Sequence, residues 1–113
     1  MDCLFCKIST GEMPAKVIYR DDFVLAFDDI HPQAPTHKLI IPEKHINTLN
    51  DLTPDDNELI GHMVGTAKLL AKELHLADDG YRLVFNCNAQ AGQTVFHIHM
   101  HLLGGRSLHW PPG

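Results

Sequence analysis

Three histidines that alternate with apolar residues constrain the fold of this chain more than any other feature. Residues 97–103 read HIHMHLL. Strict alternation is the period of a β-strand, in which successive side chains point to opposite faces of the sheet. In a helix the same three rings would spread over about 200° of circumference, at roughly 100° per residue. The pattern therefore predicts a strand with His97, His99 and His101 in a row on one face and a buried apolar face behind them.

Three imidazoles on one face are compatible with three kinds of function. They could bind a metal ion, form a nucleophile with acid–base partners, or relay a proton, because imidazole has an unperturbed pKa of about 6.5 and two distinct ring nitrogens. The alternative is that one or two of them are polar residues tolerated on a half-exposed strand. An aligned row of three next to the sequence Gly-Gln-Thr at 92–94 favours a functional role.

The rest of the sequence predicts a single α+β domain that spans residues 1–113. Thr53 and Pro54 have the pattern of a helix start, and apolar residues then recur at three- and four-residue steps to about Leu76. Short β-rich segments separated by turn residues indicate hairpins, so we expect a mainly antiparallel sheet with the helix on one face. The other predicted elements are a short helix at 3–10 and strands at 17–20, 23–27, 37–41 and 81–86.

Charge and composition limit the kinds of molecule that the protein is expected to bind and where it is expected to be located. The net charge is −5 and the nine Lys and Arg residues are spread along the chain, so no basic stripe is present for a nucleic acid polymer. A small phosphorylated ligand is compatible with this charge, because backbone amides and histidines supply local positive potential. The sequence has no long apolar run for a membrane, and residues 1–7 lack the order of a signal peptide. Together with an odd number of cysteines, three, these features predict a cytoplasmic protein.

Four segments together resemble the signature of the histidine triad (HIT) family. The first is the His-x-His-x-His pattern at 97–103, and the others are residues 27–37, 41–46 and 104–113. The last segment, which reads GGRSLHWPPG, is similar to the ending of the Hint branch, the purine nucleoside phosphoramidases. The resemblance covers essentially the whole chain. It implies a HIT-like fold, with a five-stranded, mainly antiparallel sheet, one long helix and one short helix.

The resemblance implies a hydrolase that cleaves the P–N bond of purine nucleoside 5′-phosphoramidates. In such enzymes the middle histidine, here His99, attacks the α-phosphorus and forms a nucleotidyl-histidine that water then hydrolyses. A neutral imidazole is a competent nucleophile near pH 7, and covalent catalysis divides one difficult displacement into two easier ones. His101 is expected beside the phosphate, and His37 is expected to help protonate the amine leaving group. The implied catalytic residues are His37, His97, His99 and His101, with no cofactor required for catalysis.

The resemblance also implies a binding site for a purine nucleotide such as AMP or GMP. Asp29 is expected to accept hydrogen bonds from the ribose hydroxyls, four apolar residues to surround the base, and the loop at 92–94 to cradle the phosphate, although this loop could also be a simple turn. Trp110 is expected to reach towards the partner's site in a homodimer of two edge-joined sheets. The implied nucleotide-binding residues are Phe5, Ile8, Phe27, Asp29, Ile30, Asn86, Gly92, Gln93, Thr94, His99, His101 and Trp110.

Cys3 and Cys6 have the spacing of half a tetrahedral zinc site, which needs two more ligands. In some bacterial HIT proteins a histidine after the third strand and the first triad histidine complete such a site, which by resemblance implies His45 and His97 here. Zinc would then tie the amino-terminal helix to the histidine strand and orient the residues beside His99. Two other interpretations are a pair of reduced cysteines without a metal and a thioredoxin-like redox pair, although the usual strand-to-helix context of the redox pair is missing.

Three competing functions are compatible with the same residues. Dinucleoside polyphosphate hydrolysis is the other large activity of the HIT family, but the ending at 104–113 disfavours it. A nucleotide-binding or scaffold protein with vestigial catalysis would bind AMP without needing His99. A catalytic zinc centre on the three histidines would differ from covalent catalysis because chelators would inhibit it.

Overall fold

The computed structural model describes residues 3–113. Met1 and Asp2 lie outside the described residues; they belong to the segment considered above for a signal peptide. A five-stranded sheet with one long and one short helix is confirmed. Within residues 3–113 no helix is long and apolar enough to cross a membrane. The elements, with η for a 3₁₀ turn, are α1 (Leu4–Thr10), β1 (Val17–Arg20), β2 (Val24–Asp28), β3 (Thr36–Pro42), η1 (Leu49–Asp51), η2 (Pro54–Asp56), α2 (Asn57–Glu73), β4 (Tyr81–Phe85), η3 (Ala89–Ala91) and β5 (Met100–Gly104).

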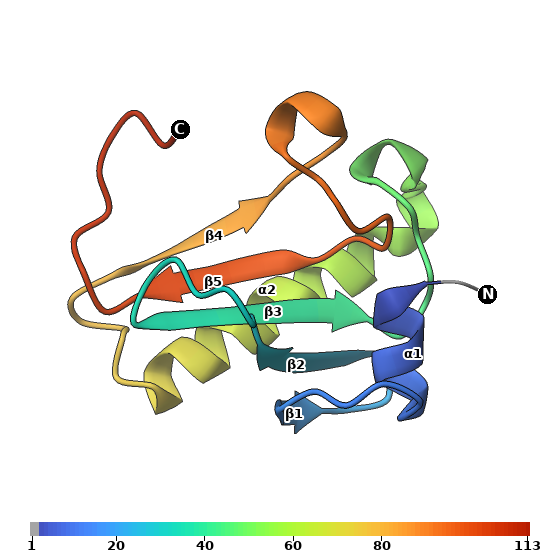
Figure 1. Ribbon diagram of the computed structural model, residues 1–113, viewed down its shortest axis with the longest axis horizontal. Helices are drawn as coiled ribbons and strands as arrows, with labels where there is room; N and C mark the ends of the chain where they lie inside the picture. The colour runs from blue at the N-terminus through green and yellow to red at the C-terminus, as the bar shows by residue number, and fades with distance from the viewer. Residues whose placement is uncertain (1–2) are drawn as a thin grey trace.

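The five strands form one antiparallel sheet in the order β1-β2-β3-β5-β4 (Figure 1). The last strand of the chain, β5, therefore lies inside the sheet, between β3 and β4. His101 on β5 is paired with Leu39 of β3 on one side and with Val84 of β4 on the other. Ladder hydrogen bonds on both sides hold the backbone of β5, so the side chain of His101 projects from a fixed position.

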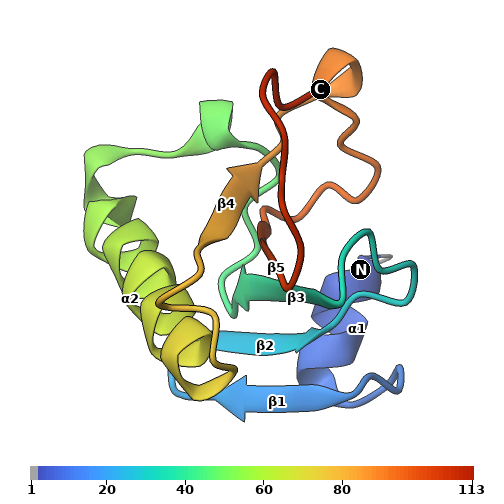
Figure 2. The same ribbon diagram turned by 90° about the vertical axis from the view of Figure 1, so that its left-hand side faces the viewer.

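The two faces of the sheet are covered by different helices (Figure 2). Helix α2 packs along one face, over a core that includes the apolar residues of the histidine segment, Ile98, Met100 and Leu102. Helix α1 covers part of the opposite face. Because side chains alternate along the chain, the histidines lie on the α1 side. The buried apolar residues on that side are Cys3, Phe5, Ile8, Leu25, Phe27, Leu39 and Ile41.

Strand β5 begins at Met100, so the strand predicted over 97–103 starts three residues too early. The neighbouring strand β3 ends at Pro42, and its ladder with β5 does not extend before Met100. Proline has no N–H to continue a ladder, and the chain after it turns away as a loop. The alternation of faces nevertheless persists, because Ile98 is buried in the same core as Met100.

Helix α2 is shorter than predicted at both ends. Thr53 and Pro54 begin the 3₁₀ turn η2, in which Asp56 Oδ2 accepts a hydrogen bond from the Thr53 N–H (3.0 Å), and the α-helix follows this turn. After the helix, His75 adopts a left-handed conformation with φ 61°, which prevents the helix from continuing to Leu76. Leu76 is still buried in the core on the α2 side, as its place in the apolar pattern indicates.

Candidate active site

The three histidines of the alternating segment lie along the α1 side of the sheet. His97 is fully buried, His99 is 8% exposed and His101 is half-buried. The ring centroids of His99 and His101 are 5.1 Å apart, and the ring of Phe5 from α1 packs edge-on against His99 at 5.0 Å. The predicted row of imidazoles is therefore confirmed. The hydrogen bonds of the rings divide it into two groups with different neighbours.

The ring of His99 has the hydrogen bonding that a nucleophile needs. Its Nδ1 lies 2.9 Å from the carbonyl oxygen of His97, which can only accept a hydrogen bond. Nδ1 therefore carries the ring proton, and the lone pair is on Nε2. Burial lowers the pKa of His99 below its ordinary value, so the ring is neutral near pH 7. A neutral imidazole with its lone pair on a defined nitrogen can attack an electrophilic phosphorus.

His37 and His101 form a hydrogen-bonded pair whose direction is set by the backbone. The N–H of Gln33 donates to His37 Nδ1 (3.0 Å), so the ring proton of His37 is on Nε2. That N–H donates to His101 Nδ1 (2.8 Å), which places the ring proton of His101 on Nε2 as well. His101 Nε2 is buried and has no hydrogen-bond partner among residues 3–113. A buried donor without an acceptor costs about 1–3 kcal/mol, and an anionic ligand would remove that cost.

Burial keeps both rings of this pair neutral at pH 7. Burial, reinforced by the neighbouring rings of His99 and His37, lowers the pKa of His101 to about 4. Burial also lowers the pKa of His37, against the opposing charge of Asp29, whose Oδ2 lies 3.4 Å from His37 Nε2. Asp29 Oδ1 accepts a hydrogen bond from the His31 N–H (2.8 Å), so the carboxylate is fixed beside the pair.

The loop before the histidine segment is braced by Gln93, which is buried. Its side-chain amide donates to the carbonyl oxygen of Asn47 (2.8 Å) and accepts from the N–H of Asn88 (2.8 Å). Its backbone N–H donates to the carbonyl oxygen of Asn88 (3.1 Å). Because these donors are used inside the protein, Gln93 holds the shape of the loop. Its neighbours Gly92 and Thr94 are exposed, and the N–H of Gly92 donates to the carbonyl oxygen of Ala89 (3.0 Å).

The residues predicted to bind the nucleoside differ in exposure. Phe5, Ile8 and Phe27 are buried on the α1 side, where the two phenylalanine rings meet edge-on with centroids 5.5 Å apart. Ile30 and Trp110 are 85% and 82% exposed. Of the four residues predicted to surround the base, Phe5, Ile8 and Phe27 are thus packed in the apolar core, and Ile30 is exposed. The half-buried members of the predicted set, apart from His101, are Asp29 and Asn86.

All four predicted metal ligands come together at the amino end of α1. Cys3 Sγ lies 3.4 Å from His97 Nδ1, and Cys6 Sγ lies 3.3 Å from His45 Nδ1. The two Nδ1 atoms are 3.2 Å apart, and the four ligand atoms all lie within 4.8 Å of one another. In a tetrahedral zinc site with Zn–N bonds of about 2.0–2.1 Å, two nitrogens are roughly 3.3 Å apart. The spacing of the four atoms therefore fits a metal ion at their centre.

The hydrogen bonds of the two rings provide an independent test of this fit. His97 Nε2 donates to the carbonyl oxygen of Pro42 (2.8 Å), and His45 Nε2 donates to Asn47 Oδ1 (2.6 Å). In both rings Nε2 is therefore used by a neighbouring oxygen and Nδ1 points into the cluster, where the two Nδ1 atoms lie 3.2 Å apart. A cysteine sulfur lies next to each Nδ1, at 3.4 Å for His97 and 3.3 Å for His45, so two imidazole nitrogens and two sulfurs face one another, which is a donor set that zinc binds. The residues present therefore fit a zinc ion.

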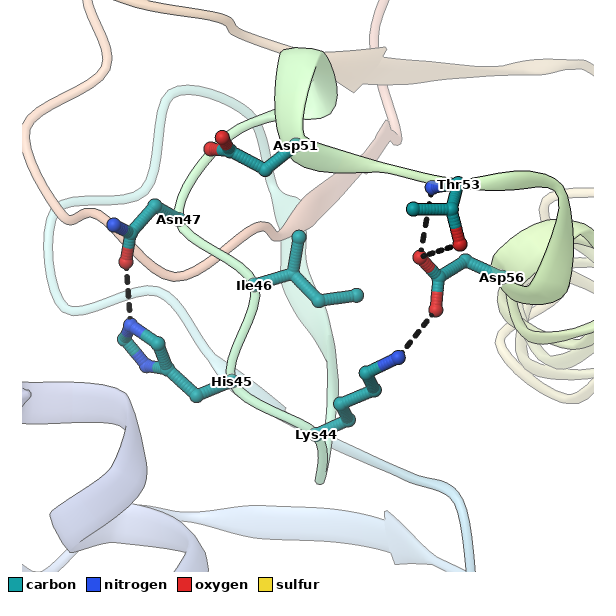
Figure 3. A pocket seen from close by; sticks show the side chains of 7 residues that line it. All are labelled: Lys44, His45, Ile46, Asn47, Asp51, Thr53 and Asp56. Carbon is teal, nitrogen blue, oxygen red and sulfur yellow. Dashed lines mark hydrogen bonds and ion pairs between the residues drawn. The ribbon is translucent and has the colours of Figure 1, made fainter.

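A pocket of about 280 Å³ borders the metal-ligand cluster at His45 (Figure 3). On one side of it Lys44 Nζ and Asp56 Oδ1 form an ion pair at 2.7 Å, and on the other side lies the hydrogen bond between His45 and Asn47. Its lining contains no histidine of the alternating segment, so the pocket is separate from His99. The lining residues are Lys44, His45, Ile46, Asn47, Asp51, Thr53 and Asp56.

Sequence reasoning missed the groups that decide where each ring carries its proton. These are the carbonyl oxygens of His97 and Pro42, the N–H of Gln33 and the side chain of Asn47. Three of the four are backbone groups, which no residue type marks in a sequence. The signal that was present is indirect, since Gln33 and Pro42 lie in segments that resemble the HIT family.

Comparisons with known proteins agree with this geometry. Residues 10–108 match the HIT domain family. The chain is 50% identical over 112 residues to an uncharacterised HIT-like protein of Synechocystis and 50% identical over 107 residues to the purine nucleoside phosphoramidase of Escherichia coli. These matches cover 99% and 95% of this chain and 97% and 90% of the relatives. A solved HIT family hydrolase from Legionella pneumophila is 59% identical, with a TM-score of 0.98 over 99% of this chain and 100% of that chain.

Proposed function

The chain belongs to the HIT domain family, and from this membership we propose that it is a purine nucleoside phosphoramidase. The proposed reaction is hydrolysis of the P–N bond of a purine nucleoside 5′-phosphoramidate through a nucleotidyl-histidine on His99. The observation that carries the proposal is the pairing of two adjacent rings. His99 has its lone pair on Nε2, and His101 has an unused, buried N–H. A nucleophile beside a donor for an anion supports phosphoryl transfer.

In the first proposed step Nε2 of His99 attacks the α-phosphorus, and the P–N bond breaks as the new bond forms. The buried N–H of His101 donates to a phosphoryl oxygen, on which negative charge increases. The amine nitrogen takes up one proton and leaves as a neutral amine. We assign this proton to the pair of His37 and His101, because an anionic phosphoryl group favours uptake of a proton by a neighbouring imidazole.

In the second step water attacks the phosphorus of the nucleotidyl-histidine. The bond between phosphorus and Nε2 breaks, a proton of the water passes to the histidine pair, and a nucleoside monophosphate is released. The Nδ1–H of His99 stays on the carbonyl oxygen of His97 throughout, because neither step uses it. The ring therefore keeps one orientation for both displacements, which avoids the cost of repositioning the nucleophile.

The proposed ligand is AMP or GMP, bound in a cytoplasmic homodimer. Asp29 would hold the ribose, and its carboxylate is kept in place by the N–H of His31 (2.8 Å). Strand β4 lies at the edge of the sheet, and an edge strand presents backbone N–H and C=O groups to a second copy. Trp110, which is 82% exposed, would then contact the partner.

We also propose a structural zinc ion held by Cys3, Cys6, His45 and His97, supported by the convergence of their four ligand atoms within 4.8 Å of one another. When bound, zinc would link α1 to the histidine segment, and catalysis would need no cofactor. Metal analysis of protein purified without chelators or a His-tag tests the proposal. About one zinc per chain is expected, with loss in Cys6→Ser, and less than about a tenth of an equivalent in the wild type would remove the proposal.

Turnover of a fluorogenic adenosine 5′-phosphoramidate by the wild type and by His99→Asn tests the proposed function. Loss of the covalent route is expected to lower the rate by several orders of magnitude, at about 1.4 kcal/mol for each tenfold change. AMP binding by both proteins is the control for an intact site. Equal rates, or a wild type that binds AMP without turnover of the substrate, would contradict the proposal and favour a binding or scaffold protein.

A further inference from the structure

Arg106 connects the carboxyl-terminal tail to the loop that precedes His37. Its guanidinium donates to the carbonyl oxygen of Gln33 through Nε (3.2 Å) and Nη2 (2.9 Å), and to that of Ser107 through Nη1 (2.9 Å). Gln33 and Arg106 are 73 residues apart in the sequence. Two N–H groups of one planar guanidinium hold a carbonyl oxygen in a defined direction, which a single flexible donor does not.

A second contact joins the tail to the same loop. Gly105 has φ 92°, and a Cβ at this position would lie 2.9 Å from the Cβ of Pro35. Glycine therefore permits both the backbone conformation and the close approach. Pro32 and Pro35 restrict the backbone on either side of Gln33. Arg106 thus holds a segment that has little conformational freedom of its own.

Gln33 transmits this restraint to the proposed active site. Arg106 holds the carbonyl oxygen of Gln33, and the backbone N–H of Gln33 donates to His37 Nδ1 (3.0 Å). That bond keeps the proton of His37 on Nε2, and the 2.8 Å bond to His101 then keeps the proton of His101 on Nε2. Asp29 Oδ2, 3.4 Å from His37 Nε2, also favours the proton on Nε2, so if the Gln33 N–H moved away only a fraction of the His37 rings would carry the proton on Nδ1 instead. In that fraction the bond between the rings would reverse, and His101 would present a lone pair to the phosphoryl oxygen.

We propose that Arg106 is a positioning residue that selects the reactive tautomers of His37 and His101. The proposal rests on the phosphoramidase function proposed above, because the orientation of the His101 N–H matters for an anionic reacting group. Arg106 acts through Gln33 and contacts no reacting atom. Its loss is expected to lower kcat by about 3- to 30-fold, the effect of weakening one or two hydrogen bonds in the transition state. KM is expected to change by less than about twofold.

Arg106→Gln removes the charge and both bonds to Gln33. Arg106→Lys keeps the charge and one donor, so it should recover part of the lost kcat. Arg82→Gln is the matched control, because Arg82 also anchors the tail, through its Nη2 to the carbonyl oxygen of His109 (3.0 Å). This control should keep the wild-type kcat. An equal fall in kcat for Arg106→Gln and Arg82→Gln would overturn the proposal, since loss of charge or of tail anchoring would explain both.

Nuclear magnetic resonance of the ring nitrogens reports the tautomers without any turnover. Proton–nitrogen correlation spectra should show His37 and His101 of the wild type with the proton on Nε2, and a mixture of tautomers in Arg106→Gln. Arg82→Gln should give the wild-type pattern. Unchanged tautomers in Arg106→Gln would overturn the proposal even if kcat fell. A wild type without phosphoramidase turnover would refute the proposed function instead, and the spectra would still decide whether Arg106 sets the tautomers.

Discussion

Gly104→Ala is predicted to destabilise the protein through one contact. Gly104 ends β5, and a Cβ at this position would lie 2.8 and 2.9 Å from the two Cδ atoms of Leu76 and 3.2 Å from its Cγ. Carbon atoms pack at about 3.5–4.0 Å, so the end of Leu76 would have to move by roughly 1 Å. Leu76 is 5% exposed and belongs to the core on the α2 side, so its neighbours would have to move with it.

The expected loss of stability is the difference between two opposing effects. An extra methyl group in a packed core costs about 1–3 kcal/mol. The backbone of Gly104 lies outside the left-handed region, so alanine adds no strain there and contributes about 0.4–1 kcal/mol by restricting the unfolded chain. The net loss is about 1–2 kcal/mol. With an unfolding entropy of about 2.1 cal/mol/K per residue, Tm should fall by roughly 4–8 °C.

A double-mutant cycle with Leu76→Ala isolates the contact. Urea unfolding of the four proteins is compared at one protein concentration and one metal content. Leu76→Ala alone should cost about 2–4 kcal/mol because it leaves a cavity. In the double variant the methyl group of residue 104 enters the vacated space, so the second substitution should add no further loss. The reasoning would be refuted if Gly104→Ala cost as much in the Leu76→Ala background as alone, or if it cost nothing in the wild type.

Three further predictions concern the proposed site and helix α2. The pKa of His101 is lowered to about 4 by burial, so between that value and about 6.5 the unfolded state binds more protons. The free energy of unfolding should therefore fall as the pH drops from about 6.5 to 4, and this half-buried ring accounts for at most about 1.4 kcal/mol per pH unit. Urea unfolding of His101→Gln should show a smaller decrease in the free energy of unfolding over the same pH range. Asp29→Asn should weaken AMP binding about tenfold or more in calorimetry, because a carboxylate accepts hydrogen bonds from both ribose hydroxyls. Binding of the 2′,3′-dideoxy nucleotide should stay unchanged, and an equal loss of affinity for both nucleotides would contradict the ribose contact. Gly61→Ala should raise the free energy of unfolding by about 0.5–1 kcal/mol, because Gly61 lies inside α2 and an added Cβ meets nothing within 4 Å; a loss of stability would indicate that a second chain packs there.

Elements whose signal is local could be predicted from the sequence. The hairpin of β1 and β2 is one example, because Asp21 and Asp22 separate two β-rich segments. Asp21 Oδ1 accepts from the N–H groups of Phe23 (2.8 Å) and Val24 (2.9 Å), so a side chain supplies the bonds of the turn. The ends of β5 and α2 could not be predicted in this way. The start of β5 depends on how far the neighbouring strand β3 extends, and the end of α2 depends on the left-handed conformation of His75. No local sequence pattern indicates either feature.

The shared face of the three histidines could be predicted, but the position of their protons could not. A period of two is a property of the extended backbone, whereas a tautomer is set by one hydrogen bond to one particular partner. The partners of His37 and His101 are reached only after the chain has folded, through the N–H of Gln33. The cluster that joins Cys3 to His97 spans 94 residues, so spacing alone predicted half of it and the family resemblance supplied the other half.

His97 explains why the histidines of one row have different roles. Its ring has Nδ1 towards Cys3 and Nε2 donating to the carbonyl oxygen of Pro42. Its own carbonyl oxygen accepts the Nδ1–H of His99 and so leaves the lone pair of His99 on Nε2. One residue thereby joins the proposed metal cluster to the proposed nucleophile without supplying a reacting atom. The fold consequently uses the alternating pattern in two ways, through the side chains of His99 and His101 and through the backbone of His97.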